Sequence, residues 1–212
     1  MRIGIQDQGF SSEPIYRLAD RTIRSWGLPY TSMVLDLGGG AGHFTRTLTD
    51  YFEYVHLMDF APIIQSKRII CSSGNLNELL PYSDATFDAV VSLEVIEHLE
   101  NPRLFVREIE RILKVNGRCL ITTPNQISLA SKFCLLLRDQ FQHFQDSCYP
   151  AHITALVPID LQRIIVEAGL RFESVAYDDD GRIPLTHKTW QILPFLTAKW
   201  FSDHVAVVAV KA

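Results

Sequence analysis

The stretch Val34-Leu-Asp-Leu-Gly-Gly-Gly-Ala-Gly42 decides the fold of this chain. Its apolar beginning, interrupted by Asp36, is typical of a buried strand, and four glycines in five residues follow at once. Glycines let the backbone turn sharply and approach a ligand closely at the carboxyl end of a strand, where open α/β sheets bind ligands. The stretch therefore predicts a strand, a ligand-binding turn and then a helix.

Several kinds of turn compete at these glycines. A phosphate-binding loop requires Gly-Lys followed by Ser or Thr, but Gly42 is followed by His43 and Phe44, so this interpretation fails. A dinucleotide fingerprint that starts at Gly38 requires a third glycine at position 43, and His43 weakens that interpretation. A merely structural turn is disfavoured because so many glycines cost backbone entropy. The spacing Gly38-x-Gly40-x-Gly42 suits a cofactor without a pyrophosphate group.

Strands and helices alternate on both sides of the turn. Apolar runs predict strands over residues 33–37, 54–59, 68–71, 87–93, 118–123, 171–177 and 204–210. Helical periodicity predicts helices over residues 10–26, 43–50, 102–113, 127–137 and 158–168. This alternation favours a parallel sheet covered by helices on both faces.

The sequence shows no repeat and no linker, so we expect one domain over residues 1–212. Within it we expect an N-terminal helical cover (1–30), a cofactor-binding core (31–125), and substrate-side loops with the last two strands (126–212). The helix over residues 10–26 would cover the acceptor pocket.

Composition narrows the class of protein. The chain has 212 residues, and 20 Lys and Arg against 24 Asp and Glu give a net charge of −4 without any basic block, which argues against a nucleic-acid binder. Its longest purely apolar stretches, such as 133–137 and 205–210, are far shorter than the ~20 residues that span a bilayer. The four cysteines form no C-x-x-C pair, and residues 1–9 contain no apolar signal-peptide core. We therefore expect a soluble, reduced, cytoplasmic protein of unknown oligomeric state.

Further motifs follow the glycine stretch in order. They are Asp59 at the end of the second strand, Gly74-Asn75-Leu76 after the third, Leu80-Pro-Tyr-Ser-Asp-Ala-Thr-Phe-Asp88 before the fourth, and Glu108-x-x-Arg111-Ile-Leu-Lys-Val-Asn-Gly117 before the fifth. Through them, residues 30–175 resemble the class I S-adenosylmethionine-dependent methyltransferases, particularly the small-molecule (type 11, ubiquinone-pathway-like) group. Two places depart from the family pattern: Asn75 replaces Asp, and Val115-Asn116 replaces Pro-Gly.

The resemblance implies a doubly wound, Rossmann-like α/β sheet of about seven mostly parallel strands, the last antiparallel, with helices on both faces. It also implies S-adenosylmethionine as the cofactor. Ten residues are expected to bind it: Asp36, Gly38, Gly39, Gly40, Gly42, Asp59, Phe60, Asn75, Leu76 and Ser92. The glycine loop and Asp36 would shape the methionine site. Asp59 would accept two charge-assisted hydrogen bonds from the ribose hydroxyls, and Asn75, Leu76 and Phe60 would frame the adenine.

The stretch Glu94-Val-Ile-Glu97-His98 follows the fourth strand. In a helical turn, Glu94, Glu97 and His98 would share one face. With His152 they would offer the ligands of a divalent cation. This arrangement resembles the metal site of small-RNA 2′-O-methyltransferases and an acidic-acidic-His element of ubiquinone-pathway O-methyltransferases. The metal would orient an acceptor hydroxyl and lower its pKa. In the alternative, a metal-free pocket, His98 or His152 is the general base and Glu97 belongs to the catalytic set.

The expected reaction is methyl transfer from S-adenosylmethionine to a small-molecule acceptor, a hydroxyl of a sugar, polyketide or quinone-type precursor. The alternatives are a catalytically inactive S-adenosylmethionine-binding scaffold and a nucleotide-dependent oxidoreductase. Residues 183–201 combine apolar, aromatic and basic side chains, which suits a lid over the pocket or contact with a membrane or a lipid-linked substrate. Asp178-Asp-Asp180 is predicted to be a solvated turn.

Overall fold

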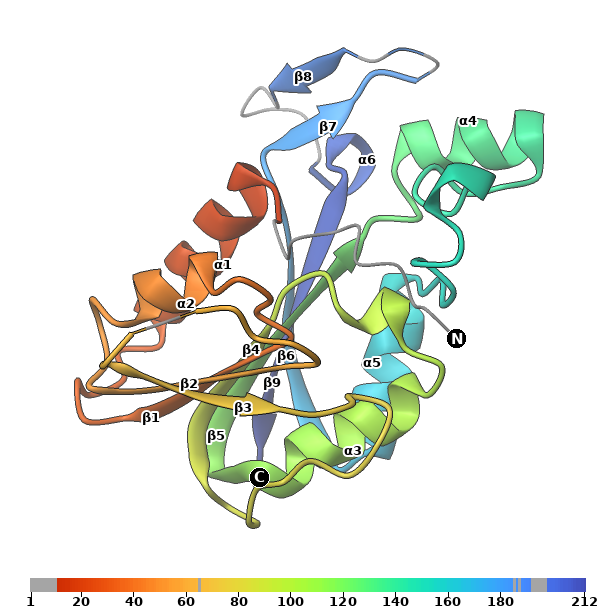
Figure 1. The fold of residues 1–212 in the computed structure, drawn as a ribbon. Helices are drawn as coiled ribbons and strands as arrows, with labels where there is room; N and C mark the ends of the chain where they lie inside the picture. Colours follow the sequence, from red (N-terminus) through yellow and green to blue (C-terminus); the bar gives the residue numbers. More distant parts are fainter. Residues whose placement is uncertain (1–10, 65, 185, 187, 192–197) are drawn as a thin grey trace.

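A seven-stranded sheet forms the centre of the molecule (Figure 1). The computed structural model describes residues 11–64, 66–184, 186, 188–191 and 198–212. In spatial order, the strands are β3 (Ile69–Ser73), β2 (Tyr54–Asp59), β1 (Met33–Leu37), β4 (Phe87–Ser92), β5 (Leu113–Pro124), β9 (His204–Lys211) and β6 (Leu170–Tyr177). The first five are parallel, whereas β9 is antiparallel to both of its neighbours. The predicted fold class is confirmed.

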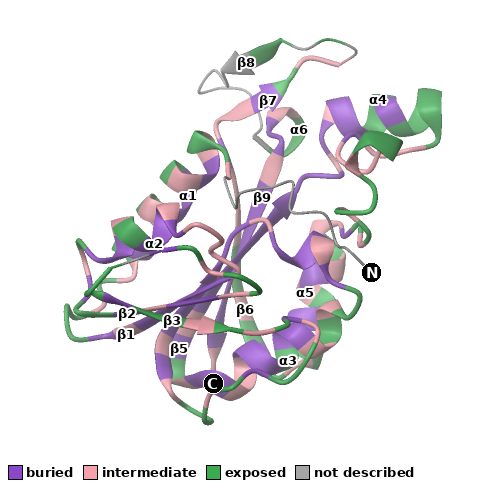
Figure 2. Ribbon diagram, viewed as in Figure 1, coloured by how far each residue is buried: buried purple, intermediate pink, exposed green. Residues whose placement is uncertain are grey.

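Helices cover both faces of the sheet (Figure 1). On one face lie α1 (Glu13–Ser25) and α2 (His43–Leu48), and on the other lie α3 (Pro102–Ile112) and α5 (Pro158–Glu167). Successive strand residues point to opposite faces, so Val34 packs with the first pair of helices and Leu35 with the second. Burial on both sides explains why the inner strands β1, β4 and β9 are largely apolar, whereas the edge strands β3 and β6 are partly exposed (Figure 2).

The carboxyl ends of the strands create the functional edge. Because β1, β4 and β5 are parallel, they all end at one edge of the sheet. The reversed strand β9 starts there, with His204 opposite Pro124. Its pairing with β6 continues to Tyr177 opposite Val205, so residue 178 also reaches this edge. Residues far apart in the sequence therefore meet in one row.

Several boundaries differ from the sequence-based expectations. The first helix begins at Glu13, and position 10, where it was expected to begin, lies outside the described residues. Strand β5 begins at Leu113 instead of residue 118, because Leu113 pairs with Phe87 across an irregular register in β4. At Asn116 the backbone is left-handed (φ 63°), which allows the bend inside this long strand.

The segment after β6 contains structure that the sequence pattern did not predict. Strands β7 (Asp180–Arg182) and β8 (Thr189–Gln191) form a separate antiparallel pair, and α6 (Ala198–Phe201) precedes β9. Together with α4 (Leu129–Arg138), they lie beyond the carboxyl ends of β5 and β6 (Figure 1). In the described part of the chain, no helix has the length and apolar character needed to cross a membrane.

Candidate functional site

The glycine loop after β1 needs its glycines for two different reasons. Gly38, Gly40 and Gly42 have φ values of 87°, 53° and 74°, in the left-handed region that glycine tolerates. Gly39 lacks space instead, because a Cβ there would lie 2.4 Å from Leu57 Cδ1 and 2.5 Å from Asp36 Oδ2. The loop is thus folded tightly over Asp36 and the end of β2.

Two carboxyl groups flank the loop but have different surroundings. Asp59 Oδ2 accepts a hydrogen bond from the Gly40 N–H (2.9 Å), and this carboxylate is only partly buried. Asp36 is 1% exposed and accepts a hydrogen bond from Thr45 Oγ1 (2.6 Å). Burial raises the pKa of Asp36 to about 7, against the opposing effect of the Thr45 hydrogen bond. A ligand can therefore reach Asp59. Asp36 is covered by the loop and affects a ligand only through the conformation of the loop.

The residues predicted to frame an adenine lie beside the end of β2. The Gly74 N–H donates to the Asp59 carbonyl oxygen (3.1 Å), which brings Asn75 close to Asp59 and Phe60. Phe60 is 76% exposed, whereas Leu76 is buried. The Asn75 side chain is engaged within its own loop, where its Nδ2 donates to Glu78 Oε1 (2.9 Å).

Ser92 ends β4, directly beside β1 at this edge. It is 1% exposed, and its Oγ has no hydrogen-bond partner among the described residues. A buried hydroxyl without a partner is unusual and fits a group that meets a ligand.

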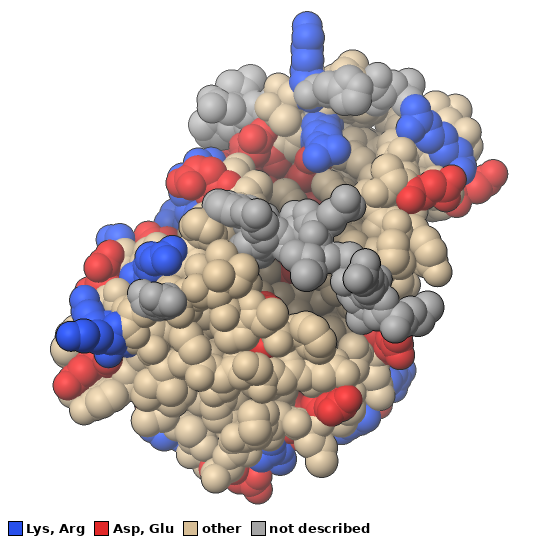
Figure 3. Space-filling view, in the orientation of Figure 1, with Lys and Arg blue, Asp and Glu red and all other residues tan. Residues whose placement is uncertain are grey.

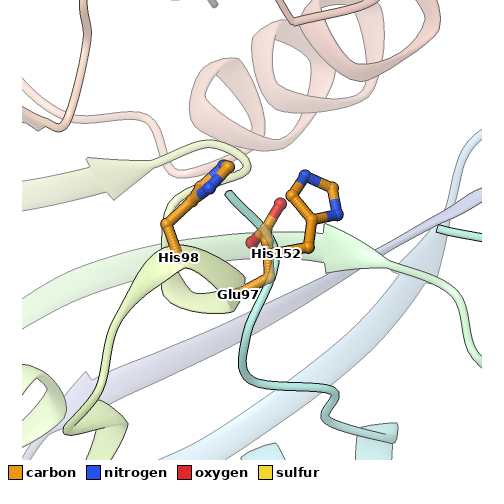
Figure 4. A group of neighbouring side chains, drawn as sticks. All are labelled: Glu97, His98 and His152. Atoms are coloured by element: carbon orange, nitrogen blue, oxygen red, sulfur yellow. The ribbon is translucent and has the colours of Figure 1, made fainter. Parts of the chain in front are cut away.

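After β4 the chain does not form the expected helical turn over Glu94, Glu97 and His98. A short 3₁₀ helix, η1 (Ile96–His98), starts only at Ile96, and Glu94 has a left-handed backbone (φ 56°) that is incompatible with a right-handed turn. The structure instead groups Glu97 and His98 with His152, and ligand atoms of these three residues all lie within 4.8 Å of one another (Figure 4). Glu94 lies outside this group.

Hydrogen bonds fix the orientation of both histidines in the group. His98 Nδ1 lies 2.8 Å from the Ala151 carbonyl oxygen, and His152 Nδ1 lies 2.6 Å from that of His143. Because a carbonyl oxygen only accepts, we assign the Nδ1 proton to both rings, which places the lone pair on each Nε2. The two rings are nearly perpendicular, with centroids 4.7 Å apart. This tautomer suits either a metal ligand or a general base.

Glu97 completes the group as a fully buried carboxyl group (0% exposed). Its Oε2 accepts a hydrogen bond from Thr123 Oγ1 (3.2 Å), whereas its buried Oε1 has no hydrogen-bond partner among the described residues. Burial and then the charge of Glu94 raise the pKa of Glu97 well above its ordinary value. Glu97 therefore holds a proton more tightly than an ordinary glutamate when no cation is nearby.

Glu94 belongs to a second group of side chains, which the sequence pattern did not predict. Its carboxylate accepts a hydrogen bond from Thr122 Oγ1 (2.8 Å) and lies 3.7 Å from His204 Nε2, whose Nδ1 is 2.7 Å from Asp178 Oδ2. Burial alone would lower the pKa of His204, but the carboxylates of Glu94, Asp178 and Asp203 raise it to about 9. The His204 side chain is 14% exposed, and the three carboxylates favour its cationic form at neutral pH.

The prediction of a solvated turn at Asp178-Asp-Asp180 is wrong for Asp178, which is buried, and for Asp180, which begins strand β7. Asp178 is 1% exposed, whereas Asp179 pairs with Arg17 at the surface (2.9 Å). The sequence signal for the burial of Asp178 lay in the two paired strands β6 and β9. In an antiparallel pair, an Asp just after one strand and a His at the start of the other lie opposite each other.

Comparisons with known proteins agree with this geometry. A family model described as a methyltransferase domain matches residues 10–175. The chain is 29% identical over 165 residues to the mitochondrial ubiquinone biosynthesis O-methyltransferase of Rattus norvegicus, covering 71% of this chain and 48% of that protein. It is 25% identical over 166 residues to the ubiquinone biosynthesis O-methyltransferase of Xanthomonas axonopodis pv. citri, covering 70% of this chain and 66% of that protein. The chain spans about half the length of the mammalian relatives it matches.

Solved structures share the fold. A SAM-dependent methyltransferase from Archaeoglobus fulgidus superposes with a TM-score of 0.66 at 18% identity, covering 92% of this chain and 94% of that chain. The [4+2]-cyclase SpnF superposes with a TM-score of 0.64 at 16% identity, covering 97% and 84%. At these identities the likeness shows the fold alone, and the cyclase illustrates that one fold hosts different reactions.

The charge on His204 predicts a pH-dependent stability. Below pH 6.5, His204→Gln should lower the free energy of unfolding by on the order of 3 kcal/mol, because the folded state binds this proton more tightly than the unfolded state. The loss should shrink as the pH rises from 6.5 and disappear above about 9, where His204 becomes neutral in both states. Urea unfolding of both proteins between pH 5 and 9.5 measures the difference.

The matched control is His56→Gln. Burial lowers the pKa of His56, so its pH trend should have the opposite sign, with the smallest loss of stability at low pH. An effect of His204→Gln that stays constant over the whole pH range would contradict the assignment of an imidazolium.

Proposed function

The chain belongs to the family of S-adenosylmethionine-dependent methyltransferases, and we propose that it transfers the methyl group of this cofactor to a hydroxyl group of a small-molecule acceptor. The observation that carries the proposal is the tight glycine loop between Asp36 and Asp59, at the carboxyl ends of β1 and β2. The relatives named as O-methyltransferases support a hydroxyl as the acceptor group.

The residues of the loop fit the cofactor. Asp59 accepts one backbone hydrogen bond at 2.9 Å and one at 3.3 Å, which leaves carboxylate lone pairs for two ribose hydroxyls. Asn75 and Leu76 stand beside Asp59, where they would frame the adenine. The Gly38–Gly42 backbone would hold the methionine part, since a Cβ at Gly38, Gly39 or Gly42 would clash with neighbouring side chains and the bare backbone is left to meet the ligand. When bound, the cofactor supplies a methyl group already activated by its sulfonium.

The chain itself contributes alignment and a proton acceptor. Because the methyl group is already activated, the chain lowers the barrier mainly by holding the cofactor and the acceptor in line in a water-poor pocket. His98 and His152 each present an Nε2 lone pair at the edge of the sheet. One of them would take the proton of the acceptor hydroxyl as the methyl group is transferred. Glu97 is buried beside the two histidines and accepts a hydrogen bond from Thr123, so its charge state would influence how readily a histidine takes up the proton.

A divalent metal is a second candidate for activating the acceptor. Its support is the group Glu97, His98 and His152, whose ligand atoms lie within 4.8 Å of one another. Both histidines also bond backbone carbonyl oxygens through Nδ1, as metal-binding histidines generally do. A cation there would replace the proton on Glu97 and lower the pKa of a bound hydroxyl. Glu94 would stay outside the ligand set.

The cysteines support the expectation of a reducing compartment such as the cytoplasm. All four, Cys71, Cys119, Cys134 and Cys148, are free thiols. Free thiols of this kind persist where glutathione and thioredoxin keep them reduced.

The cofactor proposal is tested by calorimetric titration with S-adenosylhomocysteine, with NAD as the comparison. The wild-type protein should bind S-adenosylhomocysteine one to one at micromolar concentration and should not bind NAD. Gly39→Ala should weaken the binding by roughly tenfold or more, because the new Cβ would displace Leu57 or Asp36 beneath the loop.

Gly169→Ala is the control for general destabilisation. It also adds a Cβ at a glycine, and its left-handed backbone costs roughly 1 kcal/mol, but no atom lies within 4 Å of the new carbon. Its affinity for S-adenosylhomocysteine should equal that of the wild type. Binding of NAD in place of S-adenosylhomocysteine would overturn the proposal in favour of an oxidoreductase.

The metal candidate predicts direct binding of Mn²⁺ or Mg²⁺ to the purified protein. His152→Ala should weaken that binding by roughly tenfold or more, since it removes one of three protein ligands. His56→Gln, a histidine substitution outside the group, should leave it unchanged. Full methyl transfer in an excess of chelator would reject the metal and leave the histidine base in its place.

A further inference from the structure

Helix α4 exposes the apolar face that a helix normally buries. Phe133, Leu136 and Leu137 follow each other at helical spacing and are 44%, 76% and 59% exposed. The adjoining side of the helix, with Ala130, Ser131 and Cys134, is buried against the domain. We call Phe133, Leu136 and Leu137 the apolar stripe of α4. Exposed stripes of this kind mark interaction surfaces, because an ordinary surface scatters its large apolar side chains singly.

Basic and aromatic side chains border the stripe. Lys132 and Arg138 stand at either end of it, and α6 packs beside α4. The Lys132 Nζ lies 3.7 Å from the ring centroid of Trp200, which is 40% exposed. Lys199 on α6 adds a third exposed basic side chain.

Acidic side chains only partly offset this charge. Asp139 ends α4, and Asp146 accepts a hydrogen bond from Gln140 in the following loop (2.9 Å). Figure 3 shows basic side chains around this end of the molecule, with acidic ones at its outer tip. Three basic groups against two acidic ones make the region positive within a chain whose net charge is −4.

We infer that the apolar stripe of α4 docks on the surface of a lipid bilayer that contains anionic lipids. An amphipathic helix with large apolar side chains on one face and Lys, Arg and Trp at its border has the composition of a segment that lies in the membrane interface. The Lys132 ammonium group lies over the Trp200 ring, and its long flexible stem would allow the charge to reach the head groups instead.

The size of the surface argues against a protein partner. A ten-residue helix is about 15 Å long, so its stripe offers on the order of a few hundred Å². A standard protein–protein interface needs ~800 Å² from each partner. A bilayer sets no such minimum area. A short helix can bind it through the apolar area that it buries and through its electrostatic attraction to anionic lipids.

The position of α4 in the chain connects the apolar stripe with the acceptor side of the candidate site. The loop that follows α4 leads to His152, whose Nδ1 bonds the carbonyl oxygen of His143 in that same loop. A protein docked through α4 would hold the acceptor side of its site near the bilayer. The docking surface does not depend on the proposed methyl transfer, and its test involves no catalysis.

Co-sedimentation with vesicles tests the inference. Wild-type protein is spun with vesicles of phosphatidylcholine containing phosphatidylglycerol and with vesicles of phosphatidylcholine alone. We expect binding to the anionic vesicles that weakens when the phosphatidylglycerol is omitted or the salt concentration is raised. Leu136→Glu should lower the partition coefficient by roughly tenfold or more, because it places a charge at the centre of the stripe.

Leu79→Glu is the matched control. Leu79 is 74% exposed, close to the 76% of Leu136, and it lies in the loop before β4, so the substitution makes the same charge change outside α4. It should bind vesicles like the wild type. Both variants should keep the wild-type thermal midpoint and affinity for S-adenosylhomocysteine, so a failure here is distinct from a failure of the cofactor proposal.

Three results would overturn the inference. The first is wild-type protein that stays in the supernatant with anionic vesicles. The second is equal binding by wild type and Leu136→Glu, or an equal loss in Leu79→Glu. The third is a dimer in sedimentation velocity that Leu136→Glu dissociates while neither protein binds vesicles, which would assign the stripe to a second copy of the chain.

Discussion

The cofactor half of the molecule depends on one buried carboxyl group. Asp36 lies under the glycine loop, is 1% exposed, and is fixed by the Thr45 hydroxyl from the first turn of α2. The loop can fold over it only because position 39 carries no side chain. Strand β1, the loop and α2 are thereby tied together around one polar group. Asp59, on the neighbouring strand, then bonds the Gly40 N–H and faces the outside.

The acceptor half depends on the direction of one strand. Because β9 runs against β5 and β6, it starts where they end, and His204 arrives between Glu94 and Asp178. Two buried carboxylates would be costly without a cation between them. The strained left-handed backbone of Glu94 is tolerated because Thr122 and His204 both hold its side chain.

The parts of the fold that could be predicted from the sequence are those that leave a pattern of residue types within a short stretch. Most strands of the sheet are apolar runs, and the glycine loop can be recognised from its composition. Periodicity alone did not reveal the burial of Asp178, because that burial depends on His204, a partner 26 positions away across an antiparallel pair. The departure of Glu94 from a helical turn likewise comes from Thr122 on another strand. Periodicity carries no information on such contacts.

Charge balance links the two halves of the acceptor site. Glu94 and Asp178 share the cationic His204, and Asp203 has Arg182 at 3.3 Å. Among the described residues, Glu97 has hydroxyl and imidazole neighbours, but no cation is assigned to it. A fully buried carboxyl group in that position needs either a proton or a metal ion. The choice between a histidine base and a metal site is therefore a choice between two ways of neutralising Glu97.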